Sequence, residues 1–76
     1  MTEQTKHKYH TIICEAWDLF KQNMETRDDD LTVARMQELA KKYKDTNEYA
    51  FAADLFIAVT QEITRLEVAE MEGKNE

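Results

Sequence analysis

The feature that most constrains this chain is the segment 49–66, YAFAADLFIAVTQEITRL, which is apolar around most of a helical circumference. When successive residues are placed about 100° apart, apolar side chains fill an arc of roughly 100°. That arc holds Leu55, Leu66, Val59, Ala52, Ile63 and Phe56. Other apolar residues flank it on both sides, and only Asp54, Gln61 and Arg65 form a polar stripe. Such a helix must be covered by neighbouring helices, by a second copy of the chain or by a partner protein.

Two further segments upstream show apolar residues at the helical period, which predicts helices over about 6–24 and 31–44. The first segment carries Tyr9, Ile12, Ile13, Ala16, Trp17, Leu19, Phe20 and Met24 on one arc. The second carries a narrower stripe of Thr32, Val33, Met36, Leu39, Ala40 and Tyr43. The last helix is expected over about 48–71, and residues 73–76 are expected to form a tail.

The polar connections 25–30 and 45–48 contain neither glycine nor proline, yet both offer helix-capping residues. An aspartate of 28–30 is suited to accept bonds from the free N–H groups that begin the second helix. For the third helix, Asp45 with Glu48 or Thr46 with Asn47 offers similar chemistry. Short connections favour antiparallel neighbours. The expected fold class is therefore all-α, an antiparallel three-helix bundle with a long C-terminal helix, in one domain spanning residues 1–76.

The expected core of this bundle combines one apolar stripe from each helix. It contains Ile13, Trp17 and Phe20 with Met36, Leu39 and Tyr43, packed against Leu55, Phe56, Val59 and Ile63.

Composition excludes several classes of function. The only glycine is Gly73, so a glycine-rich phosphate loop cannot form. The single cysteine, Cys14, cannot make an internal disulfide, which fits a reducing compartment. No apolar stretch is long enough to span a membrane, and the polar N-terminus lacks a signal-peptide core. A net charge of −6 argues against direct nucleic-acid binding. We expect a cytoplasmic protein without a membrane or nucleic-acid partner.

His7, His10 and Cys14 are the most suggestive chemical cluster, because spacings of three and four residues put them on one flank of a helix. Imidazole and thiolate are ligands that zinc prefers. A structural zinc site usually takes four protein ligands, however, and the sequence offers no second pair. We therefore expect neither metal nor cofactor, and a small zinc-binding regulator held by these three residues is kept as an alternative.

Signs of catalysis are also missing. Cys14 has His10 one turn away, but no third residue is recognisable that would orient the imidazole. The chain contains no serine, and the aspartates of 28–30 lack the alternation and glycine of a calcium loop. We expect the protein not to be an enzyme.

Three stretches carry a resemblance to a known group: residues 9–21 (YHTIICEAWDLFK), 42–52 (KYKDTNEYAFA) and 59–63 (VTQEI). With these the chain resembles small uncharacterised helical proteins encoded by phages and mobile elements of Gram-positive bacteria. The resemblance covers about residues 9–65 and consists of core-pattern motifs. It implies a small accessory factor that acts inside a bacterial host, without an enzymatic site.

The sequence therefore predicts a non-enzymatic, acidic interaction module that self-associates, for example as a homodimer, or binds a host or phage protein through its C-terminal helix. The expected interface is the edge and far end of that helix: Tyr49, Ala53, Ile57, Thr60, Leu66, Val68 and Met71. An alternative is an acidic inhibitor that imitates nucleic acid and occupies a host nuclease or repressor. Its net negative charge supports that alternative, although lysine and arginine interrupt the carboxylates along every helix.

Overall fold

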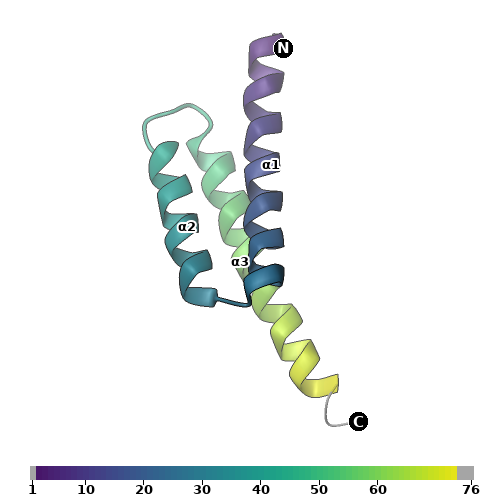
Figure 1. The fold of residues 1–76 in the computed structure, drawn as a ribbon. Helices are drawn as coiled ribbons and strands as arrows, with labels where there is room; N and C mark the ends of the chain where they lie inside the picture. The colour runs from purple at the N-terminus through teal and green to yellow at the C-terminus, as the bar shows by residue number, and fades with distance from the viewer. Residues whose placement is uncertain (1, 74–76) are drawn as a thin grey trace.

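The computed structural model describes residues 2–73, and these residues form three helices. They are α1 (Glu3–Thr26), α2 (Asp29–Lys42) and α3 (Tyr49–Gly73), and each helix contacts the other two (Figure 1). No strand occurs within residues 2–73, so the expected all-α class is confirmed.

The helix boundaries differ from the expected ones by a few residues, and local hydrogen bonds explain the differences. α1 begins at Glu3 rather than Lys6 because the Thr2 hydroxyl accepts from the Thr5 N–H (3.1 Å). α2 begins at Asp29 because Asp28 is its N-cap and accepts from the Leu31 N–H (3.0 Å). The expectation of a capping aspartate is thereby confirmed.

The C-terminal ends of α2 and α3 also differ from the expected ones. α2 stops at Lys42 rather than Lys44, since the next N–H groups bond three residues back, as from Tyr43 to the Ala40 carbonyl (3.2 Å). Thr46 does not cap α3 and instead donates its hydroxyl to the Tyr43 carbonyl (2.8 Å). α3 runs to Gly73, two residues beyond the expected end, and residues 74–76 of the expected tail lie outside the described part.

Arg27 turns the chain between α1 and α2 without help from glycine. It adopts the left-handed conformation (φ 55°), and its backbone N–H bonds the Asn23 carbonyl (2.7 Å), which closes the end of α1. Asp28 follows at once as the cap of α2. The connection is therefore only two residues long, which forces α2 back alongside α1.

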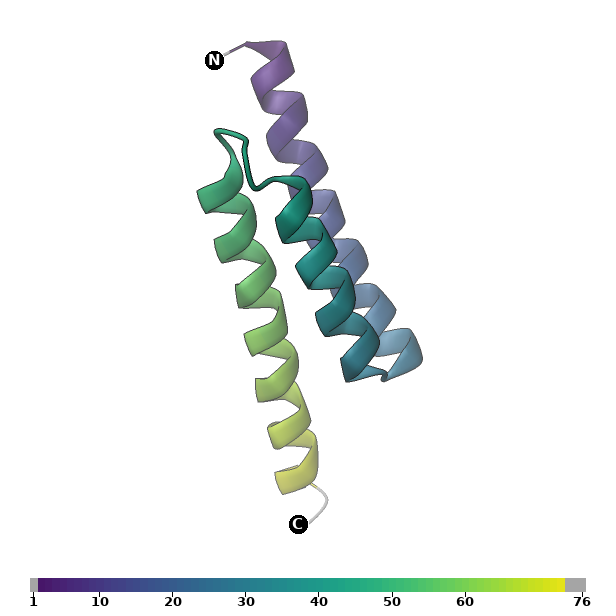
Figure 2. The same ribbon diagram turned by 90° about the vertical axis from the view of Figure 1, so that its left-hand side faces the viewer.

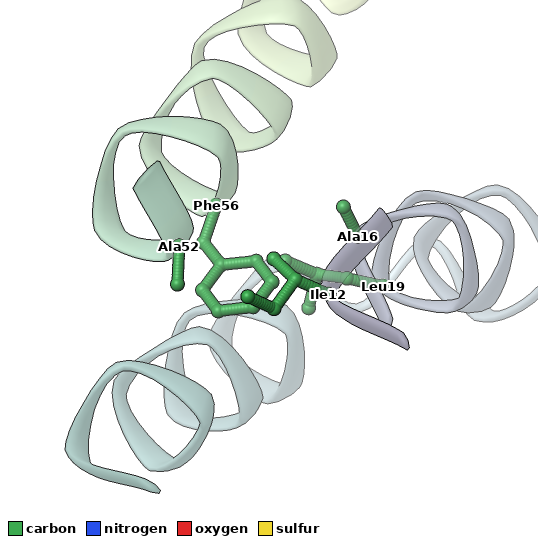
Figure 3. Close-up of a cluster of buried hydrophobic side chains, with 5 residues drawn as sticks. All are labelled: Ile12, Ala16, Leu19, Ala52 and Phe56. Carbon is green, nitrogen blue, oxygen red and sulfur yellow. The ribbon is translucent and has the colours of Figure 1, made fainter. Parts of the chain in front are cut away.

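The buried core lies where the three helices meet. Figure 3 shows the Phe56 ring extending from α3 toward Ile12 of α1, with Leu19 behind. Its buried apolar members are Ile12, Ala16, Leu19, Ala52, Phe56 and, further along α3, Ile63. Met36, Leu39, Tyr43, Leu55 and Val59 pack against this cluster while remaining partly exposed. The α2 and α3 side of the expected core is thus in place.

The expected core placement of Ile13 and Trp17 is wrong. Their exposed fractions are 52% and 59%, because α1 turns the line of Ile12, Ala16 and Leu19 toward its neighbours instead. Figures 1 and 2 show α2 on one side of the pair formed by α1 and α3. Within residues 2–73, no helix covers the flank of α1 that carries Ile13 and Trp17.

One buried polar side chain ties α1 to α2. Asn23, 1% exposed, donates from Nδ2 to the Asp29 carboxylate and to the Thr32 hydroxyl, both at 2.9 Å. Thr32 is itself buried, and its hydroxyl donates a hydrogen bond to the Asp28 carbonyl (3.0 Å). These bonds join the last turns of α1 to the first turn of α2.

The two long helices extend past α2 at opposite ends (Figure 1). α1 has 24 residues, α2 has 14 and α3 has 25, and the molecule measures 51 × 22 × 19 Å. Val68 and Met71 lie on the projecting end of α3 and are exposed. Among the described residues, no helix has both the length and the apolarity needed to cross a membrane.

Candidate interaction surface between α1 and α3

An apolar groove of about 530 Å³ lies between α1 and α3. We call it the α1/α3 groove. Its lining consists of Ile13, Ala16, Trp17 and Phe20 from α1 and Leu55, Ala58, Val59, Glu62 and Arg65 from α3. Apart from the last two, all of these side chains are apolar, which is unusual for an open surface on an acidic chain.

The α1 wall of the groove is built from the second flank of a wide apolar arc. Ile13 and Trp17 are four residues apart and therefore stack on one face of the helix. The Trp17 and Phe20 rings are stacked with centroids 6.0 Å apart and planes at 20°. Two neighbouring aromatic rings on a rigid helix make a preformed contact surface.

The α3 wall is lower, because it holds a small residue at its outer side. Ala58 is exposed, while Leu55 and Val59 are half-buried between it and the core. Glu62 and Arg65 form an ion pair at the edge. At the other end, Tyr9 and Phe51 meet edge to face with centroids 5.0 Å apart. The ion pair thus lines the groove, and the aromatic pair lies one helical turn before its first lining residues, Ile13 and Leu55.

A polar cluster on the other side of α1 holds α2 in place. The Tyr43 hydroxyl donates to Glu15, and Lys42 Nζ lies 2.8 Å from Glu15 Oε2. Glu15 is about 160° around the helix from Ile13, so this cluster faces away from the groove. α2 is thereby fixed on the side where it cannot cover Ile13 or Trp17.

These contacts change two pKa values in the cluster. The hydrogen bond to the Glu15 carboxylate raises the pKa of Lys42, because it favours the charged ammonium. Burial, followed by the hydrogen bond to Glu15, raises the pKa of Tyr43, because both disfavour the phenolate.

The interface residues expected along the edge of α3 differ in their exposure. Tyr49 and Ile57 are exposed by 41% and 44%, whereas Ala53 and Thr60 are half-buried. Thr60 lines a small hollow of about 100 Å³ that also includes Val33 of α2. Thr60 therefore lies on the side of α3 that faces α2.

The far end of α3 is the second part of that expected interface. Leu66 is half-buried, while Val68 and Met71 are exposed by 48% and 67%. Met71 also lines a hollow with Arg27 and Glu70, whose side chains form an ion pair (2.6 Å). The end of α3 is therefore partly engaged with the turn after α1.

Sequence reasoning placed Ile13 and Trp17 in the core and did not include them in the expected interface. The signal was present in the eight apolar residues of the first segment, an arc wider than two neighbours of one small bundle need.

The candidate metal ligands are brought together only in part. The His10 ring lies 3.7 Å (Nε2) from Cys14 Sγ, and both residues are exposed. His7 lines a separate polar hollow of about 490 Å³ next to the loop after α2. Within the described residues, no three histidine, cysteine, aspartate or glutamate side chains are grouped so that they could hold a metal ion.

Comparisons of the chain with protein-family models, with curated proteins and with solved structures give no match.

Proposed function

We propose that this chain is a non-enzymatic protein-interaction module, an acidic antiparallel three-helix bundle that binds another protein chain through the α1/α3 groove. The observation that carries the proposal is the exposure of Trp17 and Ile13, 59% and 52%, beside a groove lined almost entirely by apolar side chains. The C-terminal helix takes part by supplying one wall.

The energy available from this surface supports the proposal. Fully burying one large apolar side chain contributes about 1.5–3 kcal/mol relative to leaving it in water. Interfaces gain most of their binding energy from a few such anchors, and tryptophan is prominent among them. Trp17 stacked on Phe20 has the required form, since both rings sit on a helix and lose little freedom on binding.

Site-specific photo-crosslinking in cells that express the chain tests the proposal. A photoreactive amino acid replaces Trp17 in one variant and Ile57, on the edge of α3 first expected to bind, in the other. We expect covalent protein adducts from position 17 and few from position 57. Adducts from position 57 alone would move the interface to that edge, and no adduct from either position would contradict an interaction function.

A further inference from the structure

We propose that the partner of the α1/α3 groove is a second copy of this chain, and that two grooves close face to face into a two-fold symmetric dimer. This inference rests on the proposed function and names its partner. It follows from three properties of the groove: its shape, the charges at its edges and its extent.

The groove contains both a projecting side chain, Trp17, and a small side chain, Ala58, beside which the Trp17 ring of a second copy can fit. Tyr9 touches Phe51, and Trp17 and Val59 each follow eight residues further along, so Trp17 lies level with Val59 and the adjacent Ala58. A two-fold axis that runs along the groove sets α1 of one copy across α3 of the other at the same level. Each Trp17 then meets Ala58 of the second copy, where the small side chain leaves room.

One residue on each side of the groove can form an ion pair between copies: Lys21 on α1 and Glu62 on α3. Lys21 lies at the outer edge of α1, one turn after Trp17, and forms no ion pair with the described residues. Glu62 lines the α3 side of the groove at nearly the same level and pairs with Arg65 of its own helix. The same two-fold axis brings each Lys21 to Glu62 of the other copy. Repulsion between two chains of charge −6 is screened beyond about 8 Å at physiological ionic strength.

The extent of the surface suits a second copy better than a single docked helix. The groove lies within a longer apolar flank of α1 that runs from Tyr9 to Met24, roughly 22 Å, and two adjacent helices are about 18–20 Å wide. Each copy thus offers roughly 400 Å² in projection, and two copies approach the roughly 1,000 Å² that specific interfaces need. A single helix would cover the centre of the groove and leave one of the outer walls in water.

The first experiment measures solution mass against concentration. We expect twice the 9.0 kDa of one chain at high concentration and 9.0 kDa after dilution. Trp17 is the only tryptophan, so its fluorescence should shift to the red over the same dilution range. A red shift without a change of mass, or a mass of 9.0 kDa at concentrations on the order of 1 mM, would overturn the second copy as partner.

Two matched variants locate the interface. Ile13→Lys lies in the groove and Ile57→Lys lies outside it, and the two isoleucines are similarly exposed (52% and 44%). We expect I13K to weaken dimerisation at least tenfold and I57K to leave it unchanged, with circular dichroism showing that both remain helical. A dimer that I57K dissociates and I13K does not would overturn the groove as the interface.

A charge exchange tests the two-fold arrangement. We expect Lys21→Glu to weaken dimerisation by about threefold to tenfold, because two carboxylates then face each other. Adding Glu62→Lys to the same chain should recover most of that loss. A double variant no tighter than K21E would overturn the pairing of α1 with α3 across the axis.

The result separates this inference from the proposed function. Crosslinks from position 17 to a different protein, with the purified chain monomeric, would overturn the dimer and leave the interaction function standing. Crosslinks from position 17 that join two copies, lost in I13K, would support both.

Discussion

At the scale of single residues, Tyr43 helps to fix the position of α2 and so determines which face of α1 remains exposed. Its ring packs toward Phe56 with centroids 6.2 Å apart, and its hydroxyl donates to Glu15. Lys42 lies over the same ring, 5.3 Å from its centre, and pairs with Glu15. One side chain thus links the core, the end of α2 and the polar side of α1.

Tyr43→Phe tests this link through the pH dependence of stability. A pKa raised by folding gives stability that is complete below the unfolded value and is lost as pH rises through the folded value. The free energy of unfolding should therefore fall as pH rises above about 10, the ordinary tyrosine value. In Y43F that fall should be smaller, and stability near neutral pH should drop by about 1 kcal/mol for the lost hydrogen bond.

Chemical unfolding across alkaline pH, together with the ultraviolet absorbance of phenolate, measures both effects. The fall that remains in Y43F is assigned to Lys42, whose pKa is also raised. An unchanged alkaline profile in Y43F would show that Tyr43 ionises as freely in the folded chain as in the unfolded one.

At the scale of the helix, α1 carries two apolar faces with different roles. Ile12 and Ile13 are adjacent in the sequence and chemically identical, yet the first is fully buried and the second is 52% exposed. Both belong to the same apolar arc, and only the position of the neighbouring helices distinguishes them. Ile12 therefore packs in the core, and Ile13 lines the groove.

The same substitution at these two positions should separate those roles. Ile12→Ala should cost about 3 kcal/mol of unfolding free energy, because it removes buried methyl groups and leaves a cavity. Ile13→Ala should cost less than about 1 kcal/mol, since its side chain is half in water already. Urea unfolding provides the comparison, at a protein concentration where the chain is monomeric. Equal losses of unfolding free energy in the two variants would show that Ile13 is packed as tightly as Ile12.

The helices could be predicted well from periodicity, and their faces only in part. The capping aspartate, the connections and the stripe of Phe56 and Ile63 followed from local spacing and turn chemistry. The exposure of Trp17 could not be predicted in this way. A wide apolar arc indicates how much surface must be covered, but it does not indicate which flank of the helix a neighbour covers. That choice depends on the Glu15 and Tyr43 contact, which joins residues far apart in the sequence.

At the scale of the whole molecule, α2 is too short to support its neighbours along their full length. The 25 residues of α3 extend about 37 Å, against about 21 Å for the 14 of α2. Stability should therefore vary along the long axis, and it should be highest where Ile12, Leu19 and Phe56 meet.

Hydrogen exchange measures that variation directly. Amides of residues 12–23 and 52–63 should exchange slowest, whereas amides of residues 5–8 and 67–72 should exchange early through local opening. Arg27→Ala should accelerate exchange at the end of α3 further, because it removes the ion pair with Glu70. Uniform protection along α3 would mean that its projecting end is held by contacts beyond that pair.

Asn23 has one more consequence for the molecule as a whole. An aliphatic stripe tolerates sliding by a helical turn, since one methyl group replaces another at little cost. The buried amide does not, because Asp29 and Thr32 meet it in one alignment only, and any slip would leave a desolvated donor unpaired. A chain with so much exposed apolar surface has many ways to rearrange its helices and cover that surface by itself. Because Asn23 penalises those rearrangements, the α1/α3 groove stays exposed and available to a binding partner.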